Sequence, residues 1–267
     1  MKDFLLKRVG GQIARRDLLQ SFIPAGIAAG IAAGGAAGAP SLLNLSTIGG
    51  ILMSGEKLIT AKASLDHLIL GASDLDQATA WFERTTGVKP VIGGVHPGRG
   101  TRNALVSLGG RQYLEILAPD PAQQGVSLKY DLKSLSAPRL IHWVAFTKDL
   151  NLVAEKARSA GLNPVGPRDG SRARPDGRML KWSSLDVVNN DLVTLIPFFI
   201  QWAADSPHPS QDSPSGCALQ SFELESPNPL SVIKTLEAFG VKAYVKQSRE
   251  ASLRATLKTP RGKVEMG

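Results

Sequence analysis

The stretch Leu65–Phe82 reads LDHLILGASDLDQATAWF and carries the signals that decide the fold. Its first half, Leu65–Leu70, is an apolar run with the length of a buried strand, interrupted by His67. Its second half has apolar residues at helical spacing, behind the capping residues Ser73 and Asp74. The stretch therefore predicts a strand followed by a helix, with an imidazole that needs a polar partner inside the core.

The same pattern occurs three times along the chain. Each helical segment ends at a glycine (Gly87, Gly161 and Gly240), the residue that tolerates the positive φ of a helix C-terminus. The expected helices are Asp74–Thr86, Asp149–Ala160 and Pro229–Phe239, preceded by the strands Leu65–Leu70, Leu140–Phe146 and Leu219–Leu224. The strands expected after them are Val91–Val95, Asn103–Leu108 and Gln112–Leu117, then Met179–Leu185 and Asp191–Ile196 behind a long loop, then Ala243–Gln247, Leu253–Lys258 and Lys263–Met266. The sequence thus predicts an α+β protein made of repeated βαβββ modules.

These repeats divide the chain. We expect a first module at 64–134, a second at 135–202 and a third βαβββ-like unit at 217–267. The segment 203–216, AADSPHPSQDSPSG, is predicted to be a Pro/Ser linker with His208 exposed. The third unit could be a lid, a flank for the sheet, or a pairing surface in a homodimer.

Composition narrows the class of protein. The chain is 43% hydrophobic and 20% charged, which is typical of a globular protein. The first 63 residues hold seven Lys and Arg and three Asp and Glu, which leaves 24 basic and 20 acidic residues in the rest. This excess of basic residues is too small and too scattered to indicate that the protein binds nucleic acid. The single cysteine, Cys217, cannot form an internal disulfide.

The first 40 residues have the features of a targeting segment, and residues 41–63 have those of a linker. Arg15 and Arg16, followed by two leucines and the apolar run Ser21–Ala39, resemble a twin-arginine export signal, although Gln20 replaces the usual lysine. Cleavage is expected after Ala39 or Ala63, with a periplasmic product. The alternatives are an uncleaved membrane anchor and a cytoplasmic protein.

The repeat as a whole resembles the glyoxalase-like branch of the vicinal-oxygen-chelate superfamily, which includes glyoxalases, bleomycin-resistance proteins and extradiol dioxygenases. The residues that carry the resemblance are Leu65–Phe82, GGVHPGRGTRNA at 93–104, YLE at 113–115, and PSGCALQSFELESPNP at 214–229. It covers residues 65–267. It implies an open, cup-shaped mixed sheet formed by two modules, with the helices outside.

The resemblance also implies a metal site. Ligands in this superfamily come from the first and last strands of each module, which here gives His67 and Glu115, then His142 and Thr194 when RQYLEI is superimposed on NDLVTL. Two imidazoles and a carboxylate suit Fe, Mn, Ni or Zn. Threonine is a poor ligand, so Thr194 is predicted to contact substrate instead, with Asn103 and Tyr113. The alternative is a His67–Glu115 ion pair in a metal-free pocket.

Two basic segments are further candidates. The Gly-rich segment 93–103 offers His96 as a general acid or base and Arg102 as a clamp for an oxyanion. It does not lie between a strand and a helix, so it is not a dinucleotide fingerprint. The segment Arg168–Arg178, RDGSRARPDGR, is expected to be a flexible loop that either attracts an anionic substrate or is simply solvated.

Together these features favour a metal-dependent enzyme that acts on a small, oxygen-chelating organic molecule. Lyase, isomerase and dioxygenase chemistry all fit, and the sequence does not choose among them. The alternative is a metal-free protein of the same fold that binds and sequesters a small molecule. No nucleic-acid partner is expected, and a membrane only through the N-terminal segment.

Overall fold

The computed structural model describes residues 59–188, 192 and 194–267. The predicted targeting segment, and all of the predicted linker before residue 59, lie outside these ranges. Within them, no helix is both long and apolar enough to cross a bilayer.

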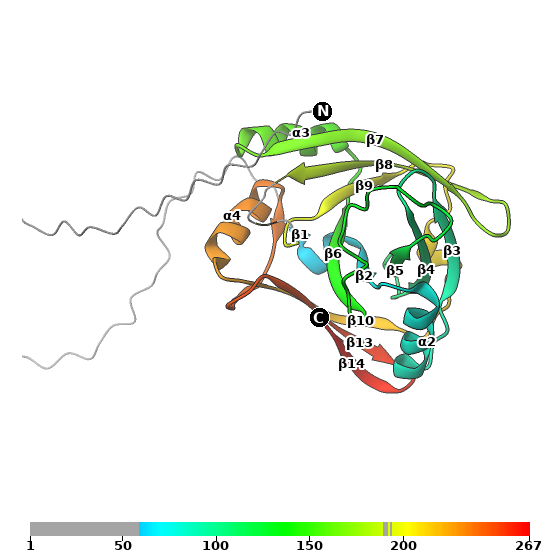
Figure 1. The fold of residues 1–267 in the computed structure, drawn as a ribbon. Coiled ribbons are helices and arrows are strands. Elements are labelled where there is room, and N and C mark those ends of the chain that lie inside the picture. Colours follow the sequence, from blue (N-terminus) through cyan, green and yellow to red (C-terminus); the bar gives the residue numbers. More distant parts are fainter. Residues whose placement is uncertain (1–58, 189–191, 193) are drawn as a thin grey trace, which may run out of the picture. The chain divides into compact units, whose positions relative to one another are not determined.

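A strongly curled sheet of eight strands forms the centre of the fold (Figure 1). Its strands are β2 (Leu65–Gly71), β3 (Val91–His96), β4 (Thr101–Ser107), β5 (Tyr113–Pro119), β6 (Arg139–Phe146), β7 (Asn163–Ala173), β8 (Met179–Val188) and β9 (Phe198–Trp202), in the order β3-β4-β5-β2-β6-β9-β8-β7. In each half the first strand pairs in parallel with the last, β2 with β5 and β6 with β9. The antiparallel pair β2–β6 joins the halves. The predicted α+β cup made from two βαβββ modules is confirmed.

The curl brings the two edge strands of this sheet, β3 and β7, into contact. Gly94 on β3 makes the approach possible, because it has φ 137° and a Cβ there would lie 2.8 Å from the carbonyl oxygen of Ala173. A side chain at this position would be strained and would also push the edges apart. The inner face of the sheet is therefore nearly enclosed where β3 meets β7.

The helices begin and end where their capping residues predict. They are α2 (Leu75–Thr86), α3 (Leu150–Ser159) and α4 (Pro229–Ala238), with a short α1 (Ala61–Ser64) and the 3-10 turn η1 (Pro209–Gln211). Asp74, Asp149 and Asn228 accept hydrogen bonds from backbone N–H groups of the first turns. Gly87 ends α2 in the left-handed region at φ 79°.

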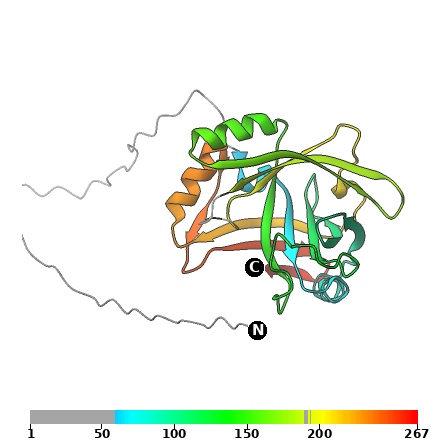
Figure 2. The ribbon, with the colours of Figure 1, turned by 45° about the horizontal axis from the view of Figure 1, so that its top comes forward.

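The third unit has its own sheet and packs outside the cup. Its strands are β10 (Ala218–Ser226), β11 (Val241–Lys242), β12 (Val245–Gln247), β13 (Ser252–Thr259) and β14 (Gly262–Met266); four of them form a sheet in the order β12-β10-β13-β14, and β11 pairs with β1 (Ile59–Thr60). Here β10 lies between β12 and β13, so the unit is not a third copy of a cup half. Phe222 packs on Trp143 of the central sheet, with ring centroids 5.3 Å apart, and the turned view shows these strands along the outside of the cup (Figure 2).

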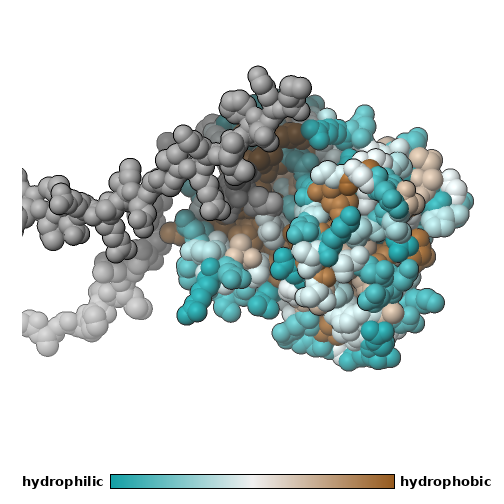
Figure 3. All heavy atoms as spheres, in the orientation of Figure 1, coloured by the Kyte–Doolittle hydropathy of each residue, from teal (hydrophilic) through white to brown (hydrophobic). Residues whose placement is uncertain are grey.

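Two cores form because strand residues alternate between the faces of the central sheet. The outer core holds Leu68, Leu114 and Trp143 and is covered by helices and by the third unit. The inner core is smaller, around Ile69, Val144 and partly buried aromatic side chains. The outside of the molecule is mostly hydrophilic or neutral in the view of Figure 3.

Two expectations about the second module are wrong. The segment expected to be a long loop contains β7, an eleven-residue strand that pairs with β8, so only 174–178 of the basic segment Arg168–Arg178 form its turn. The last strand of the module begins at Phe198, directly after Pro197, rather than at Asp191. The presence of β7 and the later start of β9 both change which side chains of the second module face the inside of the cup.

Candidate functional site

A β-bulge at the start of β2 places two consecutive side chains together. Leu65 pairs with Ala145 and His67 with Val144, so Asp66 is an extra residue in the β2–β6 ladder. His67 Nδ1 consequently lies 2.7 Å from Asp66 Oδ1, and the two side chains are 4% and 1% exposed. A buried imidazole next to a buried carboxylate has a fixed orientation: Nδ1 donates to Asp66, which leaves Nε2 for a second partner.

Glu115 lies opposite Ile69 in the β2–β5 ladder, on the same face of the sheet as His67. Its Oε2 is 3.6 Å from His67 Nε2, and its Oε1 is 3.6 Å from His96 Nε2. Asn103 Nδ2 donates to Oε1 at 2.5 Å. A carboxylate that is 7% exposed thus lies between two imidazoles, and this arrangement is the candidate site.

His96, on β3, is also held in one orientation. Its Nδ1 lies 2.9 Å from the hydroxyl of Thr101, and its Nε2 lies 3.3 Å from Asn103 Nδ2. Because the Asn103 amide nitrogen can only donate, His96 Nε2 acts as the acceptor and Nδ1 carries the proton. His96 therefore directs an unprotonated nitrogen toward Glu115, as His67 does when its ring is neutral.

A further histidine supports the site from a distant part of the chain. His208 Nε2 lies 3.1 Å from Asp66 Oδ2, which also accepts a hydrogen bond from Trp202 Nε1 at 2.9 Å. His208 Nδ1 contacts the hydroxyl of Ser210 at 2.8 Å. The prediction that His208 is exposed is wrong, since it is 1% exposed. We call the series His208, Asp66, His67, Glu115 and His96 the carboxylate–imidazole chain.

The protonation states follow from burial and hydrogen bonding. Burial alone would raise the pKa of Asp66, but the hydrogen bonds from His208 and His67 outweigh it and hold the pKa at about 2. Burial would also raise the pKa of Glu115, yet the imidazoles of His96 and His67 and the Asn103 amide lower it. Burial lowers the pKa of His96, which keeps this ring neutral at pH 7, so the Asn103 hydrogen bond is the firmer reason for an ionised Glu115.

The predicted metal ligands are only partly brought together. His67 and Glu115 meet, but the Nδ1 atom of His142 contacts the backbone N–H and carbonyl of Trp143, at 2.9 and 2.8 Å, and its ring packs against Tyr130 and Phe198. In the described part of the chain, no three His, Cys, Asp or Glu side chains are placed so that they could hold a metal ion. The side chains of His67, Glu115 and His142 therefore do not form the predicted metal site, and we propose no reaction step on a metal ion.

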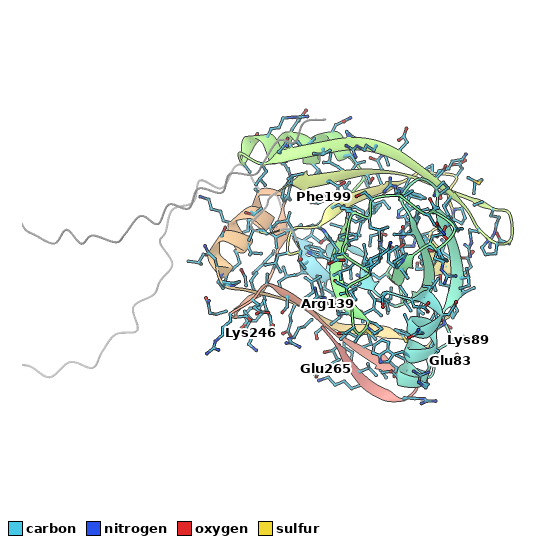
Figure 4. All side chains as sticks on the ribbon, viewed as in Figure 1. Glu83, Lys89, Arg139, Phe199, Lys246 and Glu265 are labelled. Carbon is cyan, nitrogen blue, oxygen red and sulfur yellow. The ribbon has the colours of Figure 1, made fainter. Side chains whose placement is uncertain are left out.

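The register of the sheet shows what stands in place of a second acidic ligand. Ile69, two residues after His67, pairs with Glu115, and Val144, two residues after His142, pairs with Phe198. The structural equivalent of Glu115 is therefore Phe198, and the predicted alignment with Thr194 is wrong. Thr194 lies in a turn before β9. Phe199 faces the other way and packs on Phe239, with ring centroids 5.1 Å apart (Figure 4).

The other predicted site residues divide between the two faces of the sheet. Asn103 and Tyr113 lie on the inner face, where Asn103 binds Glu115 and Tyr113 stacks on His67 with ring centroids 4.4 Å apart. Arg102 lies on the opposite face because strand residues alternate, and its Nη2 pairs with Asp76 of α2 at 3.3 Å. The structure therefore places Arg102 away from Glu115, in contrast to its predicted catalytic role.

Sequence reasoning missed Asp66, Trp202 and His208. The aspartate directly before His67 was a usable signal, because a carboxylate inside an apolar run needs a partner as much as an imidazole does. A cavity of about 810 Å³, lined among others by Asp66, Arg111 and Trp202, reaches this end of the carboxylate–imidazole chain.

Residues 65–240 match the family described as a glyoxalase-like domain. A comparison with curated proteins found no match. A hypothetical protein from Staphylococcus aureus has a similar solved structure, with a TM-score of 0.57 and 16% identity over 76% of this chain and 98% of that chain. Methylmalonyl-CoA epimerases are more distant. The enzyme from Streptomyces coelicolor gives a TM-score of 0.39 with 19% identity, covering 54% of this chain and 97% of that one. The enzyme from Mycobacterium tuberculosis gives 0.38 with 17% identity, covering 57% and 92%.

Proposed function

Because this chain belongs to the glyoxalase-like domain family, within the vicinal-oxygen-chelate superfamily, we propose that it is an enzyme that moves a proton on a small, oxygen-bearing organic molecule. The single observation that carries the proposal is Glu115, a buried carboxylate with a neutral imidazole at 3.6 Å on one side and a second imidazole at 3.6 Å on the other. Titratable groups that converge in a protein interior and perturb one another's pKa are characteristic of functional sites.

The proposed step is proton abstraction from a carbon next to a carbonyl group. Glu115 accepts the proton, and the electrons of the C–H bond form a C=C bond while the carbonyl π electrons move to oxygen, giving an enolate. His96 Nε2 can take the proton from Glu115 Oε1, and His67 Nε2 can take it from Oε2. Return of the proton to the same or a neighbouring carbon gives an isomerase, and loss of a leaving group gives a lyase.

The supporting residues hold this arrangement fixed. Asp66 binds Nδ1 of His67, so the Nε2 lone pair of His67 faces Glu115. Thr101 does the same for His96. Asn103 donates to both Glu115 and His96 and sets the distance between them, which makes it a positioning residue in this proposal.

Hydrogen–deuterium exchange tests this proposal without knowledge of the product. The full chain is incubated in D₂O with small carbonyl compounds, and the loss of C–H signals next to the carbonyl is followed by proton NMR. We expect at least one compound to exchange faster with the protein, and His96→Asn to slow this exchange by about 10²-fold. If no compound in a broad panel exchanges faster than in buffer, the proposal fails.

Metal dependence, the sequence-based prediction, has its own test. Metal analysis of the purified full chain would show about one equivalent of a transition metal, lost in His67→Ala, if that prediction holds. The proton steps above predict that exchange persists after treatment with a chelator. A metal that restores lost exchange would support the metal-dependent version instead.

A second function is favoured by the aromatic side chains of the inner core. Trp182, Trp202 and Phe198 pack there, and such surfaces bind flat organic molecules. A binding protein would retain its ligand without exchanging any proton. Saturable binding with no exchange, equally in the wild type and in His96→Asn, would identify this alternative.

We also propose export through the twin-arginine pathway, supported by the paired arginines of the N-terminal sequence. Mass spectrometry of the mature protein tests it, because a start at Pro40 or Ser64 indicates cleavage and an intact Met1 does not.

A further inference from the structure

Arg172 is the one arginine of the basic segment 168–178 that is fully buried in the described structure. It lies on β7, opposite Leu180 of β8, and is 4% exposed. Its neighbours Arg174 and Arg178 are paired, with Asp212 and Asp176 respectively, at 2.6 Å in each case. Among the described residues, Nη1 of Arg172 has no hydrogen-bond partner.

The surroundings of this guanidinium connect it to the candidate site. A Cβ at Gly94 would lie 3.0 Å from Arg172 Nη1, so the group is next to β3, where the edges of the curled sheet meet. Its charge acts on Glu115, His96 and Tyr113, all on the inner face. No ion pair joins Arg172 to Glu115 within 4 Å in the described structure, so the two charges influence each other without direct contact.

An unpaired guanidinium N–H in a protein interior costs about 1–3 kcal/mol, because the group loses water without gaining an acceptor. Arginine stays charged in such a place, since its ordinary pKa is far above neutrality. Glu115 is not that acceptor in the described structure, where Arg172 Nη1 has no hydrogen-bond partner. No described residue supplies an acceptor for this N–H, which makes a bound anion a suitable partner for it.

We infer that Arg172 binds a carboxylate group of the substrate, so that the substrates of this site are small carboxylic acids. A guanidinium and a carboxylate form two parallel hydrogen bonds in one plane, which also fixes the orientation of the bound molecule. With its carboxylate on Arg172, the molecule would lie between that residue and Glu115, where the acidic C–H can meet the base. This assignment rests on the proposed function for its catalytic meaning, but the binding step can be measured separately.

The binding test uses the full chain and titration calorimetry with 2-oxobutyrate, malonate, lactate and inorganic phosphate. Glu115→Gln is titrated alongside the wild type, so that binding is measured without turnover. We expect at least one acid to bind both proteins, Arg172→Met to weaken its binding about 10–100-fold, and Arg172→Lys to lose less. Arg168→Met, an exposed arginine on the same strand, is the control and should bind like the wild type. The methyl ester of the bound acid should bind wild type and Arg172→Met alike.

The outcomes separate this inference from the proposed function. Equal affinity of wild type and Arg172→Met for every acid would overturn the role of Arg172, as would binding of none of the acids by the wild type. Phosphate bound more tightly than any carboxylate would overturn the substrate class. If Arg172→Met does not fold, the comparison is made with Arg172→Lys. An Arg172→Lys variant that binds the acid and its methyl ester with the same affinities as the wild type would contradict a bidentate contact. Carboxylate binding that needs Arg172, without any hydrogen–deuterium exchange, would leave the inference standing and remove only the proposed proton chemistry.

Discussion

The two halves of the curled sheet share one topology but contain very different surroundings for equivalent histidines. In the first half, His67 lies between the carboxylates of Asp66 and Glu115. In the second half, His142 contacts the main chain of Trp143 and the rings of Tyr130 and Phe198. A repeated fold thus places two imidazoles on the same inner face, yet only one of them has partners that can exchange a proton.

Part of the difference arises at one position of the sheet register. The first half has a carboxylate, Glu115, where the second half has the aromatic ring of Phe198. A ring at this position contributes packing and excludes water, whereas a carboxylate contributes charge. In the proposed function, the second half therefore serves as a wall, apart from Arg172, and the proton chemistry is confined to the first half.

The largest effect on stability should come from His142. Burial lowers the pKa of His142 to about 4, with help from the Lys129 ammonium, whereas the ordinary value is 6.5. As the pH falls, the unfolded chain binds a proton at this ring before the folded protein does. The free energy of unfolding therefore keeps its full value above pH 6.5 and decreases by about 3 kcal/mol as the pH falls to 4. Urea unfolding from pH 7 to 4 measures the loss, and His142→Phe should flatten it. An unchanged pH slope in that variant would show that His142 is not buried as a neutral ring.

Asp66 should give a smaller effect in a lower pH range. Its pKa is about 2 in the folded protein, against an ordinary value of 3.8, so the unfolded chain takes up the proton first. The ionised Asp66 therefore makes its full contribution to the free energy of unfolding above pH 3.8, and about 2 kcal/mol of it is lost as the pH falls to 2. Asp66→Asn should lack this acid-sensitive part, which urea unfolding at pH 4 and pH 2.5 can detect. Identical pH dependence of wild type and variant would contradict the Asp66–His67–His208 contacts.

His208→Ala should have the smallest effect, about 1.5 kcal/mol at pH 7, because Asp66 loses one donor and keeps that of Trp202. Denaturant unfolding measures it, and His208→Gln, which can still donate, should recover part of the loss. A loss below the error of the measurement would mean that the 203–216 segment does not support the site.

Much of this organisation could be predicted from local sequence. The apolar runs, the capping residues and the helix-terminating glycines correctly indicated β2, α2 and their repeats, whereas the meeting of His67 with Glu115 was implied by the family resemblance. The strand and helix signals depend on residues close together in the chain, where steric preference and hydrogen bonding act directly.

The missed features depend on contacts between distant segments. The run from Leu192 to Trp202 is apolar except for Thr194 and Gln201, so periodicity could not place the start of β9; Pro197 was the only local sign. The bulge at Asp66 depends on pairing with β6, and His208 reaches Asp66 across 142 residues. The inward direction of Arg172 could be recognised only once β7 was known to be a strand.

The most direct test of the one-sided site compares two strand carboxylates, one buried in the site and one exposed outside it. Glu115 is buried between imidazoles, whereas Glu265 of the third unit is 72% exposed at the outer surface of β14 (Figure 4). Hydrogen–deuterium exchange of a responsive carbonyl compound should fall about 10²–10⁴-fold in Glu115→Gln and remain at the wild-type rate in Glu265→Gln. A Glu115→Gln variant that exchanges as fast as the wild type would contradict the account.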